Sequence, residues 1–159
     1  MPFDAQELRR VMGTFCTGVT VITTRDDAGR PFGLTANAIT SLSLNPPLVL
    51  ICVDRKAESF AHFYDSKVFT VNILTTGQED LSNRFAKSGG DKFTGVETVP
   101  GKCGAPLIAG ALAHMECRIT DTLEGGDHVI HVGLIEHADI WNGDPLCFFQ
   151  GRYRRLADA

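Results

Sequence analysis

The sequence predicts a mainly β domain, a closed or split antiparallel β-barrel that carries two or three short α-helices. The first observation is that about seven segments of the 159-residue chain have strand composition or strand periodicity. The second is that most of these segments are joined by hairpin-length connections, whereas parallel strands need crossovers of about a dozen residues or more. Because an open antiparallel sheet leaves two edges unpaired, a small barrel is the economical arrangement.

The N-terminal segment predicts a helix followed by a strand. Asp4 and Glu7, three residues apart, resemble a capping box. Apolar residues follow at helical spacing: Leu8, Val11, Met12 and Phe15. Gly18 ends the predicted helix, and residues 19–24 are β-branched throughout, as is typical of a strand.

The segment from Pro31 to Leu44, which follows a turn sequence over residues 26–29, predicts a strand with an unusual polar face. Its apolar face carries Leu34, Ala36, Ala38, Leu42 and Leu44. Its other face carries Thr35, Asn37, Ser41 and Ser43. Short hydroxyls and an amide suit a flat heteroaromatic ring that lies close to the backbone, although Ser and Thr also occur on ordinary exposed strands.

The middle of the chain predicts two strands and two helices. The turn over residues 45–47 leads into Leu48–Val53, which is apolar on both faces and therefore predicts a central, buried strand. A short helix over residues 57–64 and a strand over residues 68–74 follow. Thr76 and Glu79 resemble a second capping box, for a helix that ends near Lys87.

The C-terminal third predicts a loop and three strands. Residues 88–106 contain five Gly and two Pro, which is typical of a long loop. The strands are predicted over residues 111–121, 128–138 and 146–150, the last continuing toward Leu156. Gly125 and Gly126 predict a tight turn between the first two of these strands.

Length and composition predict a single domain over residues 1–159. A net charge of −4 argues against a nucleic-acid partner. The longest apolar run is shorter than a membrane span, and the first residues lack the order of a signal peptide, so we expect no membrane partner and a cytoplasmic location. Five scattered cysteines without C-x-x-C spacing exclude a zinc ribbon and disfavour a disulfide framework.

The turn from Asp54 to Ser59 is a candidate anion site. It follows the predicted buried strand and combines the cations Arg55 and Lys56 with a hydroxyl and free backbone N–H groups, which together suit a phosphate. The alternative is a solvated basic turn in which Ser59 only caps the next helix. Further basic residues strengthen the phosphate interpretation only if the two regions meet: Arg84, Lys87 and Lys92.

No sequence motif for protein-based chemistry is present. The chain has neither G-x-G-x-x-G, nor a P-loop, nor a G-x-S-x-G elbow. His128 and His131, three apart in a predicted strand, point to opposite faces, and His114 with Glu116 gives too few ligands, so we predict no metal site. If the chain is an enzyme, its reactive chemistry belongs to a cofactor.

His128 is the histidine in the most suggestive position. In Gly125-Gly126-Asp127-His128 its imidazole lies at the mouth of a tight turn, where a barrel site usually opens. The alternative is a turn histidine without a function.

Motifs along nearly the whole chain carry a resemblance. In the first half they are Met12–Thr24, Gly33–Asn37, Ser41–Ser43, Pro46–Val49 and Phe69–Leu74. In the second half they are Leu81–Ala86, Asp91–Phe93, Ala105–Leu107, Glu116–Arg118, Gly126–His128 and Leu146–Tyr153. Each motif is weak alone, but in this order they closely resemble the flavin reductase-like family.

The resemblance implies a split β-barrel that binds FMN or FAD and forms a homodimer. Its implied flavin contacts begin with Thr35, Ala36, Asn37 and Ser41 on the ring and ribityl chain, and Cys52, Val53 and Asp54 in the same pocket. Its implied phosphate contacts are Arg55, Lys56, Ser59 and Arg84. His128 would lie near bound nicotinamide as the catalytic residue, with Tyr153 beside it. Ala38 and Ile39 replace the Ser-Phe of many relatives, which leaves the flavin preference open.

The leading hypothesis is an NAD(P)H:flavin oxidoreductase that supplies reduced flavin by diffusion to a separate monooxygenase acting on aromatic substrates, with NADH favoured over NADPH by the resemblance. Hydride transfer between stacked rings needs no protein acid or nucleophile, which agrees with the lack of motifs. Two alternatives stay open: a non-catalytic flavin- or ligand-binding barrel, and a flavin-dependent reductase with another acceptor, such as a corrinoid.

Overall fold

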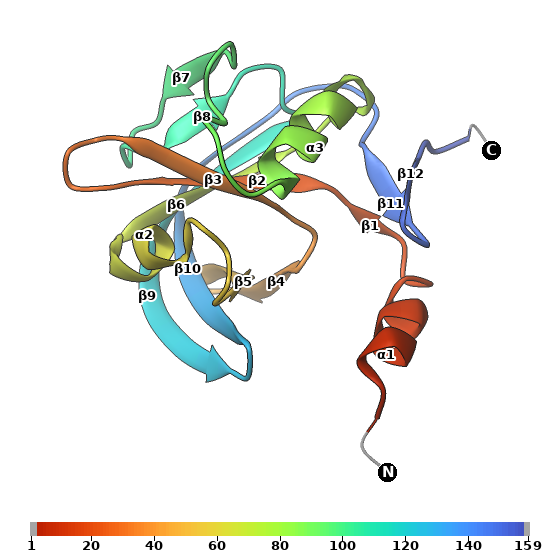
Figure 1. Cartoon of the computed structure of the whole chain (residues 1–159). Coiled ribbons are helices and arrows are strands. Elements are labelled where there is room, and N and C mark those ends of the chain that lie inside the picture. Colours follow the sequence, from red (N-terminus) through yellow and green to blue (C-terminus); the bar gives the residue numbers. More distant parts are fainter. Residues whose placement is uncertain (1–2, 158–159) are drawn as a thin grey trace.

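A seven-stranded antiparallel sheet forms the body of the protein in this computed structural model, which describes residues 3–157 (Figure 1). Its strand order is β3–β2–β6–β9–β10–β5–β4. The strands are β2 (Thr20–Arg25), β3 (Pro31–Ala36), β4 (Ile39–Leu44), β5 (Pro47–Asp54), β6 (Val68–Ile73), β9 (Ala113–Gly125) and β10 (His128–Ile140). Because β3 and β4 form the two unpaired edges, the barrel is split, and the closed form that the sequence also allowed is not adopted.

Smaller elements surround this sheet. A three-stranded sheet contains β1 (Thr17–Gly18), β11 (Cys147–Phe149) and β12 (Arg152–Arg154), and a hairpin contains β7 (Thr98–Pro100) and β8 (Pro106–Ile108). The helices are α1 (Ala5–Met12), α2 (Phe60–Asp65) and α3 (Glu79–Ala86), with the 3-10 turn η1 (Thr76–Gln78) before α3. The predicted fold class, mainly β with two or three short helices, is confirmed.

The segment predicted as one strand over residues 31–44 is two strands. The chain leaves β3 at Asn37 and Ala38 and enters β4 on the opposite edge of the sheet. A single strand could not pair with both β2 and β5, so the predicted alternation is interrupted here. Leu42 and Leu44, placed on the apolar face by the pattern, are 48% and 91% exposed.

Three other local predictions need correction. The second capping box is formed by Thr75 and Gln78, one residue before the predicted pair. Part of the predicted loop forms the β7–β8 hairpin. The last predicted strand is the β11–β12 hairpin, whose two turn residues, Gln150 and Gly151, have φ 49° and 75°, as a tight two-residue turn requires.

Strand β5 lies inside the sheet, between β10 and β4, but only one of its faces is buried. Val49, Ile51 and Val53 pack in the main core with Ile22, Phe63, Phe69, Val71 and Cys117. The alternate residues of β5 are half-buried, because their side of the strand faces open space instead of a second sheet. A cavity opens on this side of β5.

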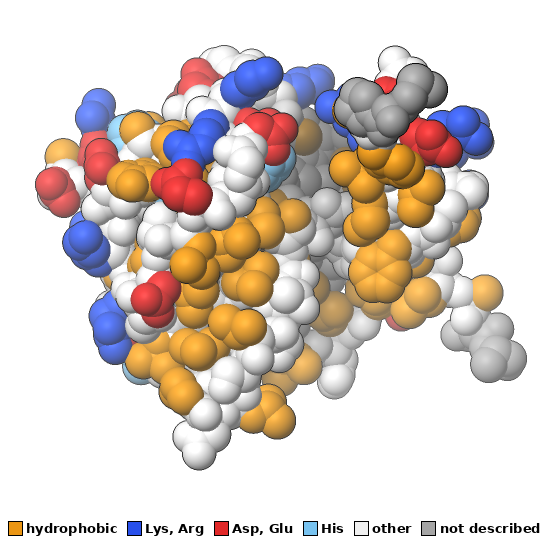
Figure 2. All heavy atoms as spheres, turned by 90° about the horizontal axis from the view of Figure 1, so that it is seen from below, with side chains coloured by type: hydrophobic (Ala, Val, Ile, Leu, Met, Phe, Trp, Pro, Cys, Tyr) orange, Lys and Arg blue, Asp and Glu red, His pale blue; other side chains and the backbone are white. Residues whose placement is uncertain are grey.

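The apolar stripe that begins on α1 is exposed. The predicted helix and its Asp4 cap are present, but the helix ends at Met12, with Gly13 as its C-cap, and not at Gly18. None of its residues is buried, and Leu8, Val11, Met12 and Phe15 are each at least half exposed. The helix lies apart from the body of the molecule in Figure 1. Figure 2 shows hydrophobic side chains on both sides of the hollow between them.

We expect Gly133→Ala to destabilise the fold by about 1–3 kcal/mol. A Cβ at Gly133 on β10 would lie 2.5 Å from Cζ of Phe69 and 2.9 Å from Cβ of Cys117, both of them buried. Urea unfolding measures the effect, with Gly18→Ala as the matched control because no atom lies within 4 Å of a Cβ there. Equal stability of the two variants would contradict this close packing.

Candidate functional site

A cavity of about 460 Å³ opens on the half-buried side of β5. One wall consists of the end of β3 and the residues that follow it: Leu34, Thr35, Ala36, Asn37 and Ala38. The floor and one end come from β5 and its following turn: Cys52, Asp54, Lys56, Ala57, Glu58 and Ser59. The opposite side comes from the end of α3 and the next loop: Phe85, Ala86, Lys87, Ser88 and Lys92. His128 completes the lining.

The β3 wall consists mostly of small residues and is held in place by hydrogen bonds to two neighbouring elements. The hydroxyl of Thr35 donates to the carbonyl of Ser82 on α3 at 2.6 Å, and the hydroxyl of Thr20 donates to the carbonyl of Ala36. Ala36 and Ala38 add little bulk on the cavity side. Burial raises the pKa of the Cys52 thiol, so this side chain of the floor is uncharged. A planar heteroaromatic ring can therefore lie close to this backbone.

The end of the cavity near α2 and α3 is basic. Lys56, Lys87 and Lys92 line it together with Ser59. Ser59 is buried, at 5% exposure, yet its side chain makes no capping hydrogen bond to α2, so the interpretation of Ser59 as only a cap is not supported. Partial burial lowers the pKa of Lys92, whose ammonium donates to the carbonyl of Phe85 at 3.3 Å. This combination of a hydroxyl and three ammonium groups suits a phosphate.

One carboxylate opposes that basic end. Glu58 lines the same cavity and accepts a hydrogen bond of 2.7 Å from the backbone N–H of Gly89. Its charge favours the protonated form of Lys92, and it also occupies the backbone donor of the residue after Ser88, which lines the cavity. The basic end is therefore partly neutralised by the protein itself.

His128 is the first residue of β10 and is paired opposite Asp54 of β5. It follows the two-residue turn Gly126-Asp127, in which Gly126 has φ 74° and β9 pairs with β10 directly behind it. Nδ1 of His128 lies 2.7 Å from Oδ1 of Asp127, and this hydrogen bond lowers the pKa of the Asp127 carboxyl. The bond leaves Nε2 as the ring nitrogen that a ligand in the cavity can contact.

The structure brings eight of the thirteen residues predicted for the site to this cavity: Thr35, Ala36, Asn37, Cys52, Asp54, Lys56, Ser59 and His128. Tyr153 of β12 lies at an adjoining cavity of about 180 Å³, which shares Thr35, Ala36 and Asn37 with the first. Its hydroxyl bonds to Ser82 at 2.8 Å and donates to Asn83 at 3.0 Å.

The other four predicted residues lie outside the cavity. Val53 faces the core, because side chains alternate along β5. Ser41 is on the exposed strand β4. The guanidinium of Arg84 donates to the carbonyl of Thr94 at 2.7 Å and lines a different cavity, while that of Arg55 turns toward the β9–β10 turn.

Sequence reasoning did not include Lys87, Ser88, Lys92 and Glu58 among the site residues. The only signal for the lysines was the concentration of basic residues around α3, and that signal did not distinguish them from Arg84. The position of each residue relative to the end of α3 determines whether it lines the cavity. Lys87 is the C-cap of α3 and Lys92 follows it, and both line the cavity, whereas Arg84 lies in the last turn of the helix and does not.

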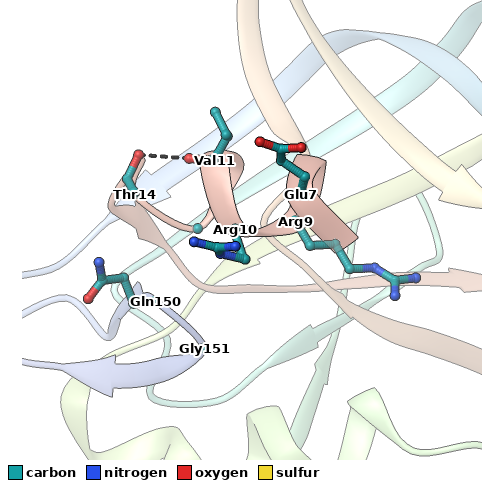
Figure 3. A pocket seen from close by; sticks show the side chains of 8 residues that line it. Glu7, Arg9, Arg10, Val11, Thr14, Gln150 and Gly151 are labelled. Carbon is teal, nitrogen blue, oxygen red and sulfur yellow. Dashed lines mark hydrogen bonds between the residues drawn. The ribbon is translucent and has the colours of Figure 1, made fainter. Parts of the chain in front are cut away.

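Two further cavities adjoin α1. One, of about 620 Å³, lies between α1 and the sheet and adjoins the candidate site, with which it shares Asn37, Ala38 and Cys52. The other, of about 560 Å³, lies between α1 and the β11–β12 turn and is lined by residues such as Arg9, Arg10 and Gln150 (Figure 3). None of the predicted site residues lines this second cavity.

Two negative findings hold for residues 3–157. No group of three or more His, Cys, Asp or Glu side chains is arranged to hold a metal ion there. No helix in that range has the length and apolarity needed to cross a membrane.

Comparison with known proteins gives the family. The family model described as "Flavin reductase like domain" matches residues 12–157. The chain belongs to this family. A flavin reductase of this kind is an oxidoreductase, so the predicted family and reaction class are confirmed.

Relatives of this flavin reductase have closely related names. The NADH-dependent FAD reductase of Streptomyces globisporus is 46% identical, over 98% of this chain and 88% of its own length. The reductase component of a 4-nitrophenol 4-monooxygenase/4-nitrocatechol 2-monooxygenase of Rhodococcus opacus is 41% identical, over 96% of this chain and 81% of that relative. Some relatives are longer: the chain spans 58% of the stachydrine N-demethylase reductase subunit of Rhizobium meliloti.

Solved structures of flavin reductases share the fold. The Streptomyces globisporus NADH:FAD oxidoreductase SgcE6, in complex with NAD and FAD fragments, superposes with a TM-score of 0.93 at 46% identity, covering 99% of this chain and 95% of that one. The flavin reductase PheA2 in its native state has a TM-score of 0.89 at 40% identity, covering 98% of this chain and 100% of that one.

We expect Ser59→Ala to weaken FMN binding about ten- to a hundredfold (~1.5–3 kcal/mol) and to leave riboflavin binding almost unchanged, because only FMN carries the phosphate. Flavin fluorescence titration measures both affinities. Arg84→Ala is the control, since the structure places Arg84 at another cavity. Equal losses for FMN and riboflavin would place the phosphate elsewhere, and a selective loss in Arg84→Ala would favour the contact that the resemblance implied.

Proposed function

We propose that this chain transfers hydride from NADH to FAD or FMN and releases the reduced flavin to a separate monooxygenase. One observation carries the proposal: a single cavity brings together a wall made mostly of small residues, a basic end and His128. The names of the relatives support it, since one is an NADH-dependent FAD reductase and another is the reductase component of a nitrophenol monooxygenase.

The residues of the cavity fit a flavin. The buried Ser59 hydroxyl, which makes no capping bond, and the lysines around it match a phosphate, while the β3 wall leaves room for a ring against the backbone. A bound flavin supplies the ring that accepts a hydride from reduced nicotinamide. The residues that suit the phosphate and those that suit the ring are separate, because the basic end and the β3 wall come from different elements.

Each group of residues then has a physical task. Lys56, Lys92 and Ser59 bind the phosphate and fix the position of the ring along the cavity. His128 contacts the nicotinamide through Nε2, while Asp127 accepts from Nδ1 and so fixes the tautomer and the orientation of the imidazole. Correct placement of two rings is itself a large contribution to hydride transfer.

Release of flavin is favoured by the charge balance of the site. Glu58 places a carboxylate at the mouth of the cavity and occupies the N–H of Gly89, which a phosphate could otherwise use. Repulsion between this carboxylate and a phosphate weakens binding. Moderate affinity suits a flavin that must leave after reduction.

NADH is the preferred donor in this proposal. The NADH-dependent relative supports this choice. The deciding assay follows the absorbance of NADH and NADPH with FMN, FAD or riboflavin; if neither donor is oxidised with any flavin, the proposal is wrong.

We also infer a cytoplasmic location. All five cysteines are free thiols, which agrees with a reducing compartment. Localisation of a tagged chain by cell fractionation tests this inference.

We further propose that the chain forms a homodimer. Leu8, Val11 and Met12 on α1 and Phe15 just after it are exposed, and Leu42 and Leu44 are exposed on the edge strand β4. Large apolar surfaces of this kind on a small protein mark an interaction site. A two-fold interface buries the same surface on both copies, and two-fold dimers are the commonest oligomers that identical chains form.

Light scattering at micromolar concentration should therefore give twice the chain mass of 17.3 kDa. Replacing Val11 and Phe15 together by Ser should shift the mass toward one chain, because it removes apolar surface that only a partner covers. A wild-type particle of 17.3 kDa would contradict the homodimer.

We expect His128→Ala to raise KM for NADH and to lower kcat/KM at least tenfold, about 1.4 kcal/mol, with flavin affinity almost unchanged. Stability should change little, since the side chain lies at a turn and is 40% exposed. Steady-state kinetics and thermal unfolding of the same variant measure both quantities. Lower stability with unaltered NADH kinetics would exclude His128 from the active site.

A further inference from the structure

The side chain of Arg55 holds the turn that carries His128. Its Nε donates to the carbonyl of Gly126 at 3.3 Å, and its terminal nitrogen pairs with the carboxylate of Glu124. The guanidinium also lies over the ring of Phe60, with Cζ 5.8 Å from the ring centre. Three partners from two separate parts of the chain therefore fix one side chain.

We propose that Arg55 is a positioning residue for His128 and that it does not bind phosphate. The proposal rests on the proposed function, in which His128 contacts the nicotinamide. Arg55 holds the β9–β10 turn, and the position of this turn determines where the imidazole of His128 lies.

The backbone explains why this turn needs support. The pairing of β5 with β10 ends at Asp54 and His128, and one further bond, from the N–H of Arg55 to the carbonyl of Asp127 at 3.0 Å, extends it into the turn. Asp127, the hydrogen-bond partner of His128, is 84% exposed and has little packing of its own. A side chain that ties both Gly126 and Glu124 to β5 therefore limits the motion of Asp127 and His128 together.

Arginine suits this task better than lysine. Its planar group donates in several fixed directions, so it can reach a carbonyl and a carboxylate at once while one face lies on an aromatic ring. An ammonium group would reach only one of these partners well. A phosphate, in contrast, accepts lysine as a point charge, so the two functions of Arg55 predict different results for Arg55→Lys.

The position of its neighbours supports the same assignment. Lys56 and Ser59 line the cavity, whereas Arg55 does not. The carboxylate of Asp54 accepts from the N–H of Lys56 at 2.8 Å, which fixes the backbone so that Lys56 points into the cavity and Arg55 away from it. Successive residues thus serve the flavin side and the nicotinamide side.

The experiment compares Arg55→Ala, Arg55→Lys and the control Arg30→Ala. Arg30 pairs with Asp26 in another hairpin turn, away from the cavity, so the control removes an exposed ion pair of the same kind. Both Arg55 variants should raise KM for NADH about tenfold, with Arg55→Lys failing to rescue, while the affinities for FMN and riboflavin in fluorescence titration stay within twofold of the wild type. Arg30→Ala should change none of these quantities.

Hydrogen exchange gives a readout that does not depend on activity. In the flavin-free protein, the peptide over residues 124–130 should exchange severalfold faster in Arg55→Ala and Arg55→Lys than in the wild type or in Arg30→Ala. Glu124→Gln should show the same change to a smaller extent, since the carbonyl of Gly126 and the ring of Phe60 still hold Arg55.

Two results would overturn the proposal. A loss of FMN affinity without a loss of riboflavin affinity in Arg55→Ala, restored by Arg55→Lys, would make Arg55 a phosphate ligand. Faster exchange with unaltered NADH kinetics would make it a structural residue of the turn only. NADH kinetics of His128→Ala distinguish failure of the Arg55 proposal from failure of the proposed function. If that variant also has normal NADH kinetics, the function proposed for His128 has failed, and not only that of Arg55.

Discussion

The pairing of β5 with β10 is the interaction on which the site depends. It aligns His128 with Asp54, and so brings the start of one strand, reached through a tight turn, to the end of another. Alternation along β5 then sends Ile51 and Val53 into the core and Cys52 and Asp54 toward the cavity. A shift of the register by one residue would exchange these faces, burying the polar set and exposing the core.

The split of the barrel supplies the other wall of the site. Since the chain crosses from β3 to β4 at Asn37 and Ala38, the sheet stays open at this point, and the end of β3 faces the turn after β5 instead of pairing with β4. Closure would bring backbone hydrogen bonds into this space and leave no room for a ligand. An edge that a sheet normally protects here borders the candidate site.

Charge is divided around the candidate cavity in a way that fits two different ligands. The ammonium groups of Lys56, Lys87 and Lys92 gather at one end, while Asp54 and Asp127 lie beside His128. Glu58 reduces the attraction of the basic end. This arrangement agrees with the names of the relatives, which describe reductases that act with NADH and FAD and reductase components of monooxygenases.

The sequence by itself determined the local elements and the family. The β-branched run at residues 19–24, the apolar run Leu48–Val53 and the glycines at 125 and 126 specify backbone conformation through neighbouring residues, and the corresponding strands and turn are present. The motifs from Met12 to Tyr153 identified the family because their order along the chain is itself information. Eight of the thirteen site residues, most of them implied by the resemblance to this family, line one cavity.

Only the tertiary structure decided which of those faces meet. Nothing local distinguishes Arg84 from Lys87 and Lys92, or Arg55 from Lys56, because a long cationic side chain has the same propensities in each place; its direction depends on partners far along the chain, such as Gly126 for Arg55 and Thr94 for Arg84. The break at Asn37 likewise follows from pairing with β2 on one side and β5 on the other. Periodicity encodes the two faces of a strand, whereas the neighbour of each face is set by long-range pairing, which a local pattern does not contain.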